Sequence, residues 1–305
     1  MCNQIKGVIK MITENAKEAA LKMRKICKKS DDQRDAGLPT DIPEVERIDN
    51  LQYGNDSTWN LLDIYLPKKR DGKVPTIIHI HGGGWCYGTK ETYQFYGMNL
   101  AKNGFGFINF NYPLAPNVQF PKELDAVNQV FHWVANHGSE YDLDLNNVFI
   151  SGDSAGGQMA EQYLTILYND EYRKLFNYQK PALTVRAATF NCGAYFLRLQ
   201  GIIEGAVEAY FPPEIVANNK ERLDTEKYMT PNMPPIFIMT ANHDFLHDAA
   251  IRLDGYMIAK GINHELHIYG DENNPREHVF HINQRDVIAA KCNQDELEFY
   301  RKYLK

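Results

Sequence analysis

The sequence predicts an α/β fold, in which a mostly parallel central sheet carries helices on both faces. Three observations support this fold class: short and nearly continuous apolar runs, helix-length segments between them, and one late run that alternates. Strands of a parallel sheet read as continuous apolar runs because helices cover both of its faces. We expect the core strands at these runs: 76–80, 106–110, 148–151, 185–190 and 236–240.

The remaining elements follow from spacing and periodicity. Helices are expected between the strands and at the end of the chain: near 91–103, 121–137 and 155–168, and at about 283–303. Residues 45–53 and 59–66 flank a turn at 54–56 and predict an antiparallel pair of strands. Residues 264–269 alternate between apolar and polar, which is typical of an edge strand.

We expect residues 1–45 to form a helical cap and linker segment, followed by the α/β domain at 46–305. Apolar residues recur at three- and four-residue steps and predict an amphipathic helix whose stripe packs on the rest of the protein: Ile5, Ile9, Ile12, Ala16, Ala19, Met23 and Ile26. Residues 29–43 are charged and contain Pro and Gly, which predicts a linker or mobile loop. The aromatic-rich interval at about 192–233 predicts a cap insertion that helps to roof a pocket.

Composition narrows the classes of partner and location. The 305 residues carry a formal net charge of -6, so no basic field favours binding to nucleic acid. No apolar stretch approaches the roughly 20 residues that a membrane-spanning helix needs. Five scattered cysteines without a C-x-x-C pair are typical of free thiols in a reducing compartment. We therefore expect a cytoplasmic protein without stable membrane insertion, and a homodimer stays open.

Ser154 lies in a G-x-S-x-G motif at residues 152–156, directly after an apolar strand and directly before a helix. A sharp strand-to-helix turn exposes the serine hydroxyl at the carboxyl edge of the sheet, and glycine neighbours let the turn close. Average residue usage produces this motif by chance in roughly one chain in ten. Its position between a strand and a helix is therefore the stronger evidence that Ser154 is a nucleophile.

A glycine run at residues 81–85, His-Gly-Gly-Gly-Trp, follows the strand at 76–80. Consecutive glycines let backbone N–H groups converge on one point, as the oxyanion of a tetrahedral intermediate requires. We expect donors at Gly83, Gly84 and Ala155. A phosphate-binding loop is the alternative, but it requires a following Lys-Ser/Thr or a G-x-G-x-x-G frame, and neither is present. Four residues are expected to support the loop and the serine: His81, Gly82, Trp85 and Asp153.

Three blocks of the sequence carry a resemblance to a known family. The His-Gly-Gly-Gly-Trp run, the Tyr-Pro-Leu-Ala-Pro run at 112–116 with Phe120-Pro121, and Gly-Asp-Ser-Ala-Gly-Gly at 152–157 resemble the hormone-sensitive-lipase-like branch of the α/β-hydrolases. The resemblance runs from about residue 60 to the C-terminus and implies an α/β-hydrolase fold with an esterase or lipase activity. It also implies Asp244 as the acid and His278 as the base of a catalytic triad.

The residues themselves leave alternatives for the acid and the base. Asp244 follows the strand at 236–240, at the edge where open α/β sheets carry catalytic groups, and the order Ser, Asp, His is the order that this fold uses. The competing acids are Asp248 and Glu272, and the competing base is His281. In the family a tyrosine is usually followed by arginine where Pro113 stands here, and residues 1–50 match no family block.

Together these motifs predict a serine carboxylesterase that hydrolyses short- to medium-chain acyl esters of small molecules through an acyl-enzyme. The chemistry requires no metal and no organic cofactor. His243 and His247 have helical spacing, but no carboxylate beyond Asp244 would complete a metal site with them. An arylformamidase-like amidase is the nearest alternative, since the same triad cleaves activated amides. A binding protein of this fold without catalysis is disfavoured, because serine, acid and histidine are all present.

Overall fold

Within residues 2–305, which the computed structural model describes, the core is an eight-stranded sheet of order β1-β2-β4-β3-β5-β6-β7-β8. Side chains are described from residue 14 onward. Strand β2 runs antiparallel to its neighbours β1 and β4, and the other neighbouring pairs are parallel. The strands are β1 (Val45–Gln52), β2 (Leu61–Pro67), β3 (Val74–Ile80), β4 (Gly106–Phe110), β5 (Leu143–Asp153), β6 (Val185–Asn191), β7 (Ile236–Ala241) and β8 (His264–Tyr269).

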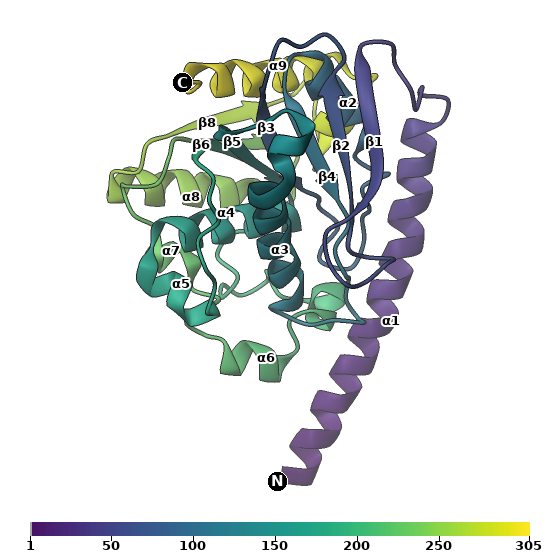
Figure 1. Cartoon of the computed structure of the whole chain (residues 1–305). Helices are drawn as coiled ribbons and strands as arrows, with labels where there is room; N and C mark the ends of the chain where they lie inside the picture. Colours follow the sequence, from purple (N-terminus) through teal and green to yellow (C-terminus); the bar gives the residue numbers. More distant parts are fainter. Residues whose placement is uncertain (1) are drawn as a thin grey trace.

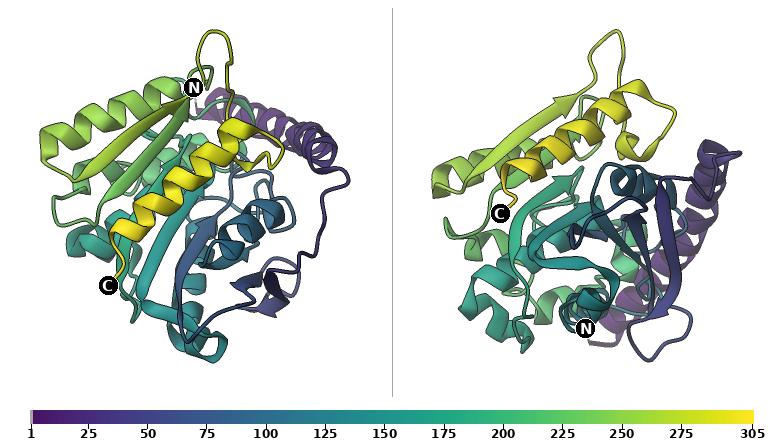
Figure 2. Two further views of the ribbon diagram at one scale, coloured as in Figure 1. Left: turned by 90° about the horizontal axis from the view of Figure 1, so that it is seen from above. Right: turned by 45° about the horizontal axis from the view of Figure 1, so that its top comes forward.

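Helices cover both faces of the sheet (Figures 1 and 2). The α-helices are α1 (Cys2–Asp35), α2 (Gln94–Lys102), α3 (Lys122–His137), α4 (Ala155–Tyr168), α5 (Asp170–Phe176), α6 (Pro213–Asn218), α7 (Thr225–Tyr228), α8 (His247–Lys260) and α9 (Val287–Lys302). Short 3-10 turns are η1 (Gly138–Tyr141), η2 (Gly205–Ala209) and η3 (Phe280–Ile282). None of the helices in the described chain has the length and apolar character that crossing a membrane demands.

Each face of the sheet has its own apolar core. On β3 the side chain of Ile77 joins the core beneath α2 and α9, whereas Ile78 and Ile80 join the core beneath α3, α4 and α8. Successive side chains of a strand point to opposite faces, so a strand buried on both sides is mostly apolar along its whole length. The predicted fold class is therefore confirmed: the five apolar runs are β3 to β7, and 264–269 is the edge strand β8.

Helix α1 packs against η2, and its N-terminal part extends past the rest of the molecule (Figure 1). Ala16 of the predicted stripe is buried against the body, and Ala19 and Met23 are partly buried. The prediction that Ile26 packs inward with the same stripe is wrong, because this residue is 58% exposed. Arg24 faces the body and hydrogen-bonds to it. Ile26 lies two residues farther along, about 200° around the helix, and therefore faces away from the body. Ile5, Ile9 and Ile12 of the stripe lie outside the described side chains.

The linker predicted at 29–43 is wrong in its first part, because α1 continues to Asp35. The charged residues there are paired within the helix: Arg34 contacts Asp31 at 2.7 Å and Asp35 at 2.5 Å. Arg285, from the loop before α9, donates to the backbone carbonyl of Arg34. The last carbonyls of a helix lack partners within the helix, so this contact satisfies and anchors its C-terminal end.

The interval 192–233 between β6 and β7 holds η2, α6 and α7. Tyr210 and Phe211 of this interval are buried, and the hydroxyl of Tyr210 accepts a hydrogen bond of 3.1 Å from the backbone N–H of Glu123 on α3. The turn η2 also packs against α1. The helix and the insertion thus contact each other over the body, while the division into a 1–45 segment and a 46–305 domain stays a prediction.

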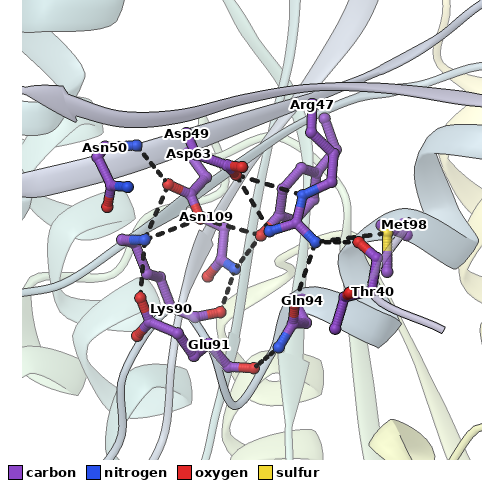
Figure 3. Close-up of polar contacts among 11 residues, drawn as sticks. Thr40, Arg47, Asp49, Asn50, Asp63, Lys90, Glu91, Gln94, Met98 and Asn109 are labelled. Carbon is purple, nitrogen blue, oxygen red and sulfur yellow. Dashed lines mark hydrogen bonds and ion pairs between the residues drawn. The ribbon is translucent and has the colours of Figure 1, made fainter. Parts of the chain in front are cut away.

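A buried ion pair fixes the segment that follows the glycine run to the sheet (Figure 3). The ammonium of Lys90 lies 2.9 Å from the carboxylate of Asp63 on β2, and both side chains are almost fully buried. Lys90 also contacts Glu91 at 2.8 Å, and its carbonyl accepts a bond of 2.5 Å from Asn109 on β4. Buried charges are tolerated where they are paired and hydrogen-bonded, so this cluster holds one end of the loop in place.

Candidate active site

Ser154 lies at the sharp turn between β5 and α4, with φ 53° and ψ −119°. A residue with a side chain rarely adopts positive φ, and such strain persists only where the surroundings enforce it. The turn closes because its neighbours lack side chains. A Cβ at Gly152 would lie 2.3 Å from the carbonyl oxygen of Gly156, and one at Gly156 would lie 2.0 Å from that of Ile80. The glycines of the motif are therefore a steric requirement of this turn.

A line of hydrogen bonds joins Ser154, His278 and Asp244. Nε2 of His278 lies 2.9 Å from Oγ of Ser154, and Nδ1 lies 2.7 Å from Oδ1 of Asp244. Asp244 also accepts from the hydroxyl of Thr240 at 3.0 Å and from the N–H of Leu246 at 2.8 Å. Burial would raise the pKa of the Asp244 carboxyl, but the hydrogen bonds from His278 and Leu246 outweigh it and hold that pKa below its usual value.

The competing candidates lie elsewhere. The side chain of Asp248 is fully exposed on α8 and pairs with His247. Glu272 is exposed in the loop after β8. His281 is completely buried beneath the site, and burial lowers the pKa of its imidazole to about 4. Of the candidate acids and bases, Asp244 and His278 are the pair that the fold brings to Ser154.

Ligand atoms with the spacing of a metal site occur in one place in the described part of the chain. Cys192, Asp244 and His278 each offer an atom, and all three atoms lie within 4.8 Å of one another. His243 and His247 do not belong to this group. Burial raises the pKa of the Cys192 thiol well above its usual value, with the nearby Asp244 carboxylate adding to the rise. The thiol therefore stays protonated beside the carboxylate.

The glycine loop holds backbone donors beside Ser154. Gly83 has φ 121° and Gly84 has φ 58°, and a Cβ at Gly83 would lie 2.1 Å from the carbonyl oxygen of Tyr87. Across residues 2–305, no backbone acceptor receives a hydrogen bond from the N–H groups of Gly83, Gly84 or Ala155. These three donors, which the sequence singles out, are thus available to a bound oxygen atom.

Comparisons with known proteins agree with this architecture. The family model BD-FAE matches residues 62–194. The carboxylesterase NlhH of Mycobacterium tuberculosis is 25% identical over 240 residues, which are 75% of this chain and 74% of that protein. Esterase B of Lactobacillus rhamnosis superposes with a TM-score of 0.85 at 21% identity, covering 94% of this chain and 96% of that chain. This chain has the α/β-hydrolase fold of Esterase B and is similar in sequence to carboxylesterases.

A third relative shows how far the likeness extends. R526 of Acanthamoeba polyphaga mimivirus, named as an alpha/beta hydrolase, is 27% identical over 203 residues. The match covers 64% of this chain and 58% of the viral protein. The resemblance that the sequence blocks indicate is therefore supported by likeness to carboxylic ester hydrolases, whereas the roles of individual residues rest on the site itself.

In this α/β-hydrolase, buried hydrogen bonds tie the glycine loop to the turn at the serine. The N–H of Gly82 donates to the hydroxyl of Tyr93 at 3.0 Å, and this hydroxyl donates to Asp153 at 2.7 Å. Nδ1 of His81 lies 2.8 Å from the Gly82 carbonyl oxygen, and its ring stacks on Tyr112 at 4.0 Å between centroids. Burial lowers the pKa of His81 to about 4, so the ring is neutral at physiological pH. The loop and the serine turn are thus held as one unit.

The sequence patterns did not single out Arg24, which ties α1 to the same loop. Its guanidinium donates to the backbone carbonyls of Cys86 at 2.5 Å and of Ala115 at 2.6 Å. Trp85, next to Cys86, is buried and packs edge-on against Phe211 of the insertion at 5.0 Å between ring centroids. The periodicity of polar residues could have revealed this face of the helix, because Arg24, Cys27, Asp31 and Arg34 recur at three- and four-residue steps.

A cavity of about 790 Å³ borders Ser154, His278 and the glycine loop. Helix α1 contributes one wall with Met23, Cys27, Ser30, Asp31 and Arg34. Apolar lining comes from the insertion and from the loop after β7, through Ala194, Ile202, Val207, Phe245 and Leu246. Ser154 therefore borders a cavity whose walls come from three separate parts of the chain: α1, the insertion and the loop after β7.

Proposed function

We propose that this chain is a serine carboxylesterase that hydrolyses short- to medium-chain acyl esters of small molecules. The observation that carries the proposal is the hydrogen-bonded line from Asp244 through His278 to Ser154, at the edge of a cavity of about 790 Å³. Roughly 300 to 1,000 Å³ is typical of small-molecule sites, and this cavity lies in that range. The names and folds of the relatives support ester hydrolysis as the reaction class.

Acylation begins when Oγ of Ser154 attacks the ester carbonyl carbon while Nε2 of His278 takes its proton. Asp244 accepts the hydrogen bond from Nδ1 and so keeps the imidazole in the tautomer that has a free Nε2 lone pair. The N–H groups of Gly83, Gly84 and Ala155 donate to the oxyanion. His278 then protonates the alcohol oxygen, the bond between that oxygen and the carbonyl carbon breaks, and the acyl-enzyme remains.

Deacylation repeats these steps with water. His278 takes a proton from the water as its oxygen attacks the acyl carbon, and the same backbone donors stabilise the second oxyanion. The proton then passes from His278 to Oγ of Ser154 as the acyl bond breaks, which releases the carboxylic acid and restores the enzyme. Every proton is carried by the side chain of His278, so the mechanism depends on its two hydrogen bonds, to Ser154 and to Asp244.

Replacing the nucleophile tests this mechanism. Ser154→Ala should lower kcat for p-nitrophenyl butyrate by about a million-fold, the scale seen when the serine of a serine hydrolase is removed. Ser139→Ala is the matched control, because Ser139 is an exposed serine in η1. A phosphonate ester should label Ser154 in the wild-type chain and not in Ser154→Ala. Full activity in Ser154→Ala would overturn the assignment, and wild-type protein that neither turns over esters nor is labelled would favour a binding role.

The substrate class needs its own measurement. We expect kcat/KM to be highest for p-nitrophenyl esters of short to medium acyl chains and to fall for long ones. N-formylkynurenine should be a poor substrate beside them, and the opposite order would favour an arylformamidase-like amidase. Cytoplasmic location and a homodimer remain predictions of the sequence, to be checked by fractionation and by sedimentation.

A further inference from the structure

Phe245 is 76% exposed, although it lies beside the reacting groups. Its ring centroid is 4.3 Å from that of His278, with the two planes inclined at 46°. Ile258 and Val287 are similarly exposed, at 67% and 75%, but they do not border the cavity that contains Ser154. Scattered apolar side chains on a surface need no explanation. An exposed aromatic ring that lines this cavity and touches the proposed base is placed to contact a ligand.

The backbone holds Phe245 in a fixed relation to this histidine. The N–H of Asp244 donates to the carbonyl of Ala241 at 3.1 Å, and the N–H of His247 donates to the carbonyl of Asp244 at 3.0 Å. Leu246 donates its N–H to the Asp244 carboxylate at 2.8 Å. Both neighbours of Phe245 are therefore bonded to the turn that aligns His278. The ring leaves the chain from a rigid segment, so its exposure does not come from a loose loop.

The direction of proton transfer indicates which part of the ester lies here. During acylation Nε2 of His278 protonates the oxygen of the leaving alcohol, so this oxygen lies within hydrogen-bond distance of Nε2. The rest of the alcohol begins one bond away, beside the imidazole against which Phe245 packs. We propose that Phe245 binds the alcohol part of the ester and makes the enzyme selective for esters of aromatic or flat apolar alcohols. This inference rests on the proposed function.

The lining around Phe245 suits such a group. Leu246 follows it in the chain, and Ile202 and Val207 reach the same cavity from the insertion. Aromatic rings pair in offset or edge-on geometry and gain stabilisation beyond the area that they bury. A benzyl or naphthyl group beside Phe245 would thus exchange water for apolar and aromatic surface, whereas a methyl or ethyl group is too small to cover the ring.

Two esters with the same acyl group isolate this effect. Benzyl acetate and ethyl acetate give the same acetyl-enzyme, so they share deacylation and differ only in the alcohol. We expect wild-type enzyme to prefer benzyl acetate in kcat/KM, and Phe245→Ala to reduce the benzyl-to-ethyl ratio by about tenfold. Phe245→Leu should recover only part of the ratio. Ile258→Ala, an equally exposed apolar residue outside the cavity, is the matched control and should leave the ratio unchanged.

Each other outcome has a definite meaning. If Phe245→Ala lowers kcat/KM for both acetates equally, the ring only supports His278 and the inference is overturned. If the variant changes the ratio of ethyl hexanoate to ethyl acetate and leaves the benzyl-to-ethyl ratio intact, Phe245 contacts the acyl chain, and the inference is again overturned. Both results leave the esterase proposal standing. Failure of wild-type enzyme to turn over any ester and to react with a phosphonate contradicts the proposed function itself.

Discussion

Two kinds of structure meet at the cavity, and they are held by different forces. Ser154 and Asp244 follow strands of the parallel part of the sheet, where ladder hydrogen bonds set the register of neighbouring backbones. Met23 and Arg34 line the same cavity from α1. This helix lies outside the sheet and is held by side-chain contacts such as those of Arg24. The proposed chemistry thus rests on the sheet, and much of the cavity shape is added from outside it.

This difference separates the expected effects of mutations. A change at the ends of the strands should alter the chemical step by orders of magnitude without moving the walls. A change in α1 or in the insertion should alter stability or turnover far less. The comparison fails if a substitution in a wall proves as damaging as one in the hydrogen-bonded line.

Among substitutions that keep the nucleophile, the largest effect is expected on the side of the sheet, from Asp244→Asn. An amide can donate to Nδ1 of His278, which favours the tautomer with its proton on Nε2, and this tautomer cannot accept the serine proton. By the precedent of serine proteases, kcat should fall by about ten-thousand-fold. Steady-state hydrolysis of p-nitrophenyl butyrate measures the loss, and circular dichroism checks the fold. Asp248→Asn, at the exposed neighbour on α8, should be nearly silent; if it is the damaging change, the acid is misassigned.

A smaller effect, on stability, is expected in the insertion at Glu226 of α7. Burial raises the pKa of this carboxyl from 4.5 to about 7, although the backbone N–H of Phe196 donates to it. Between these values the folded chain binds the proton and the unfolded chain has lost it, so the free energy of unfolding falls as pH rises. The fall should total about 3 kcal/mol, on the order of a hundredfold in the folding equilibrium, and end above pH 7.

Glu226→Gln keeps the acceptor for Phe196 and removes the titration. Urea unfolding from pH 5 to pH 8 should show a flatter profile for this variant than for wild type. Glu214→Gln, at an exposed carboxyl on α6, is the control and should keep the wild-type slope. If the free energy of unfolding depends on pH equally in wild type and in Glu226→Gln, another titrating group causes the dependence, and the prediction for Glu226 is wrong.

The same two regions differ in how much their sequence predicts. The turn at Ser154 requires glycine at 152 and 156, since a Cβ at either position would collide with backbone atoms. A steric requirement of this kind appears in the sequence as a motif. Core strands such as β3 are legible too, because burial on both faces demands continuous apolar runs. Local sterics and burial are properties of neighbouring residues, so a single sequence displays them.

The placement of α1 depends on residues that are far away in the chain. Ile26 looks apolar and inward by periodicity, yet the helix is rotated so that Arg24 reaches carbonyls 62 and 91 residues away. The helix also continues past its predicted end, because Arg34 pairs with Asp31 and Asp35 and so makes a charged segment stable as a helix. The exposure of Phe245 cannot be predicted from the sequence either, because it depends on whether distant segments of the chain cover the ring.

The smallest effect is expected from Arg24→Met, which tests how far α1 influences the chemistry. Methionine keeps the apolar stem and removes two charge-assisted hydrogen bonds, one to Cys86 in the loop that carries Gly83 and Gly84 and one to Ala115. Loosening the backbone donors weakens stabilisation of the oxyanion more than it weakens binding of the substrate. We therefore expect kcat to fall by about tenfold, near 1.4 kcal/mol, with little change in KM. Lys25→Met, on the exposed face of the same helix, is the control. A loss confined to KM would mean that α1 shapes only the cavity, and a loss as large as that of Asp244→Asn would mean that the glycine loop needs the helix to form at all.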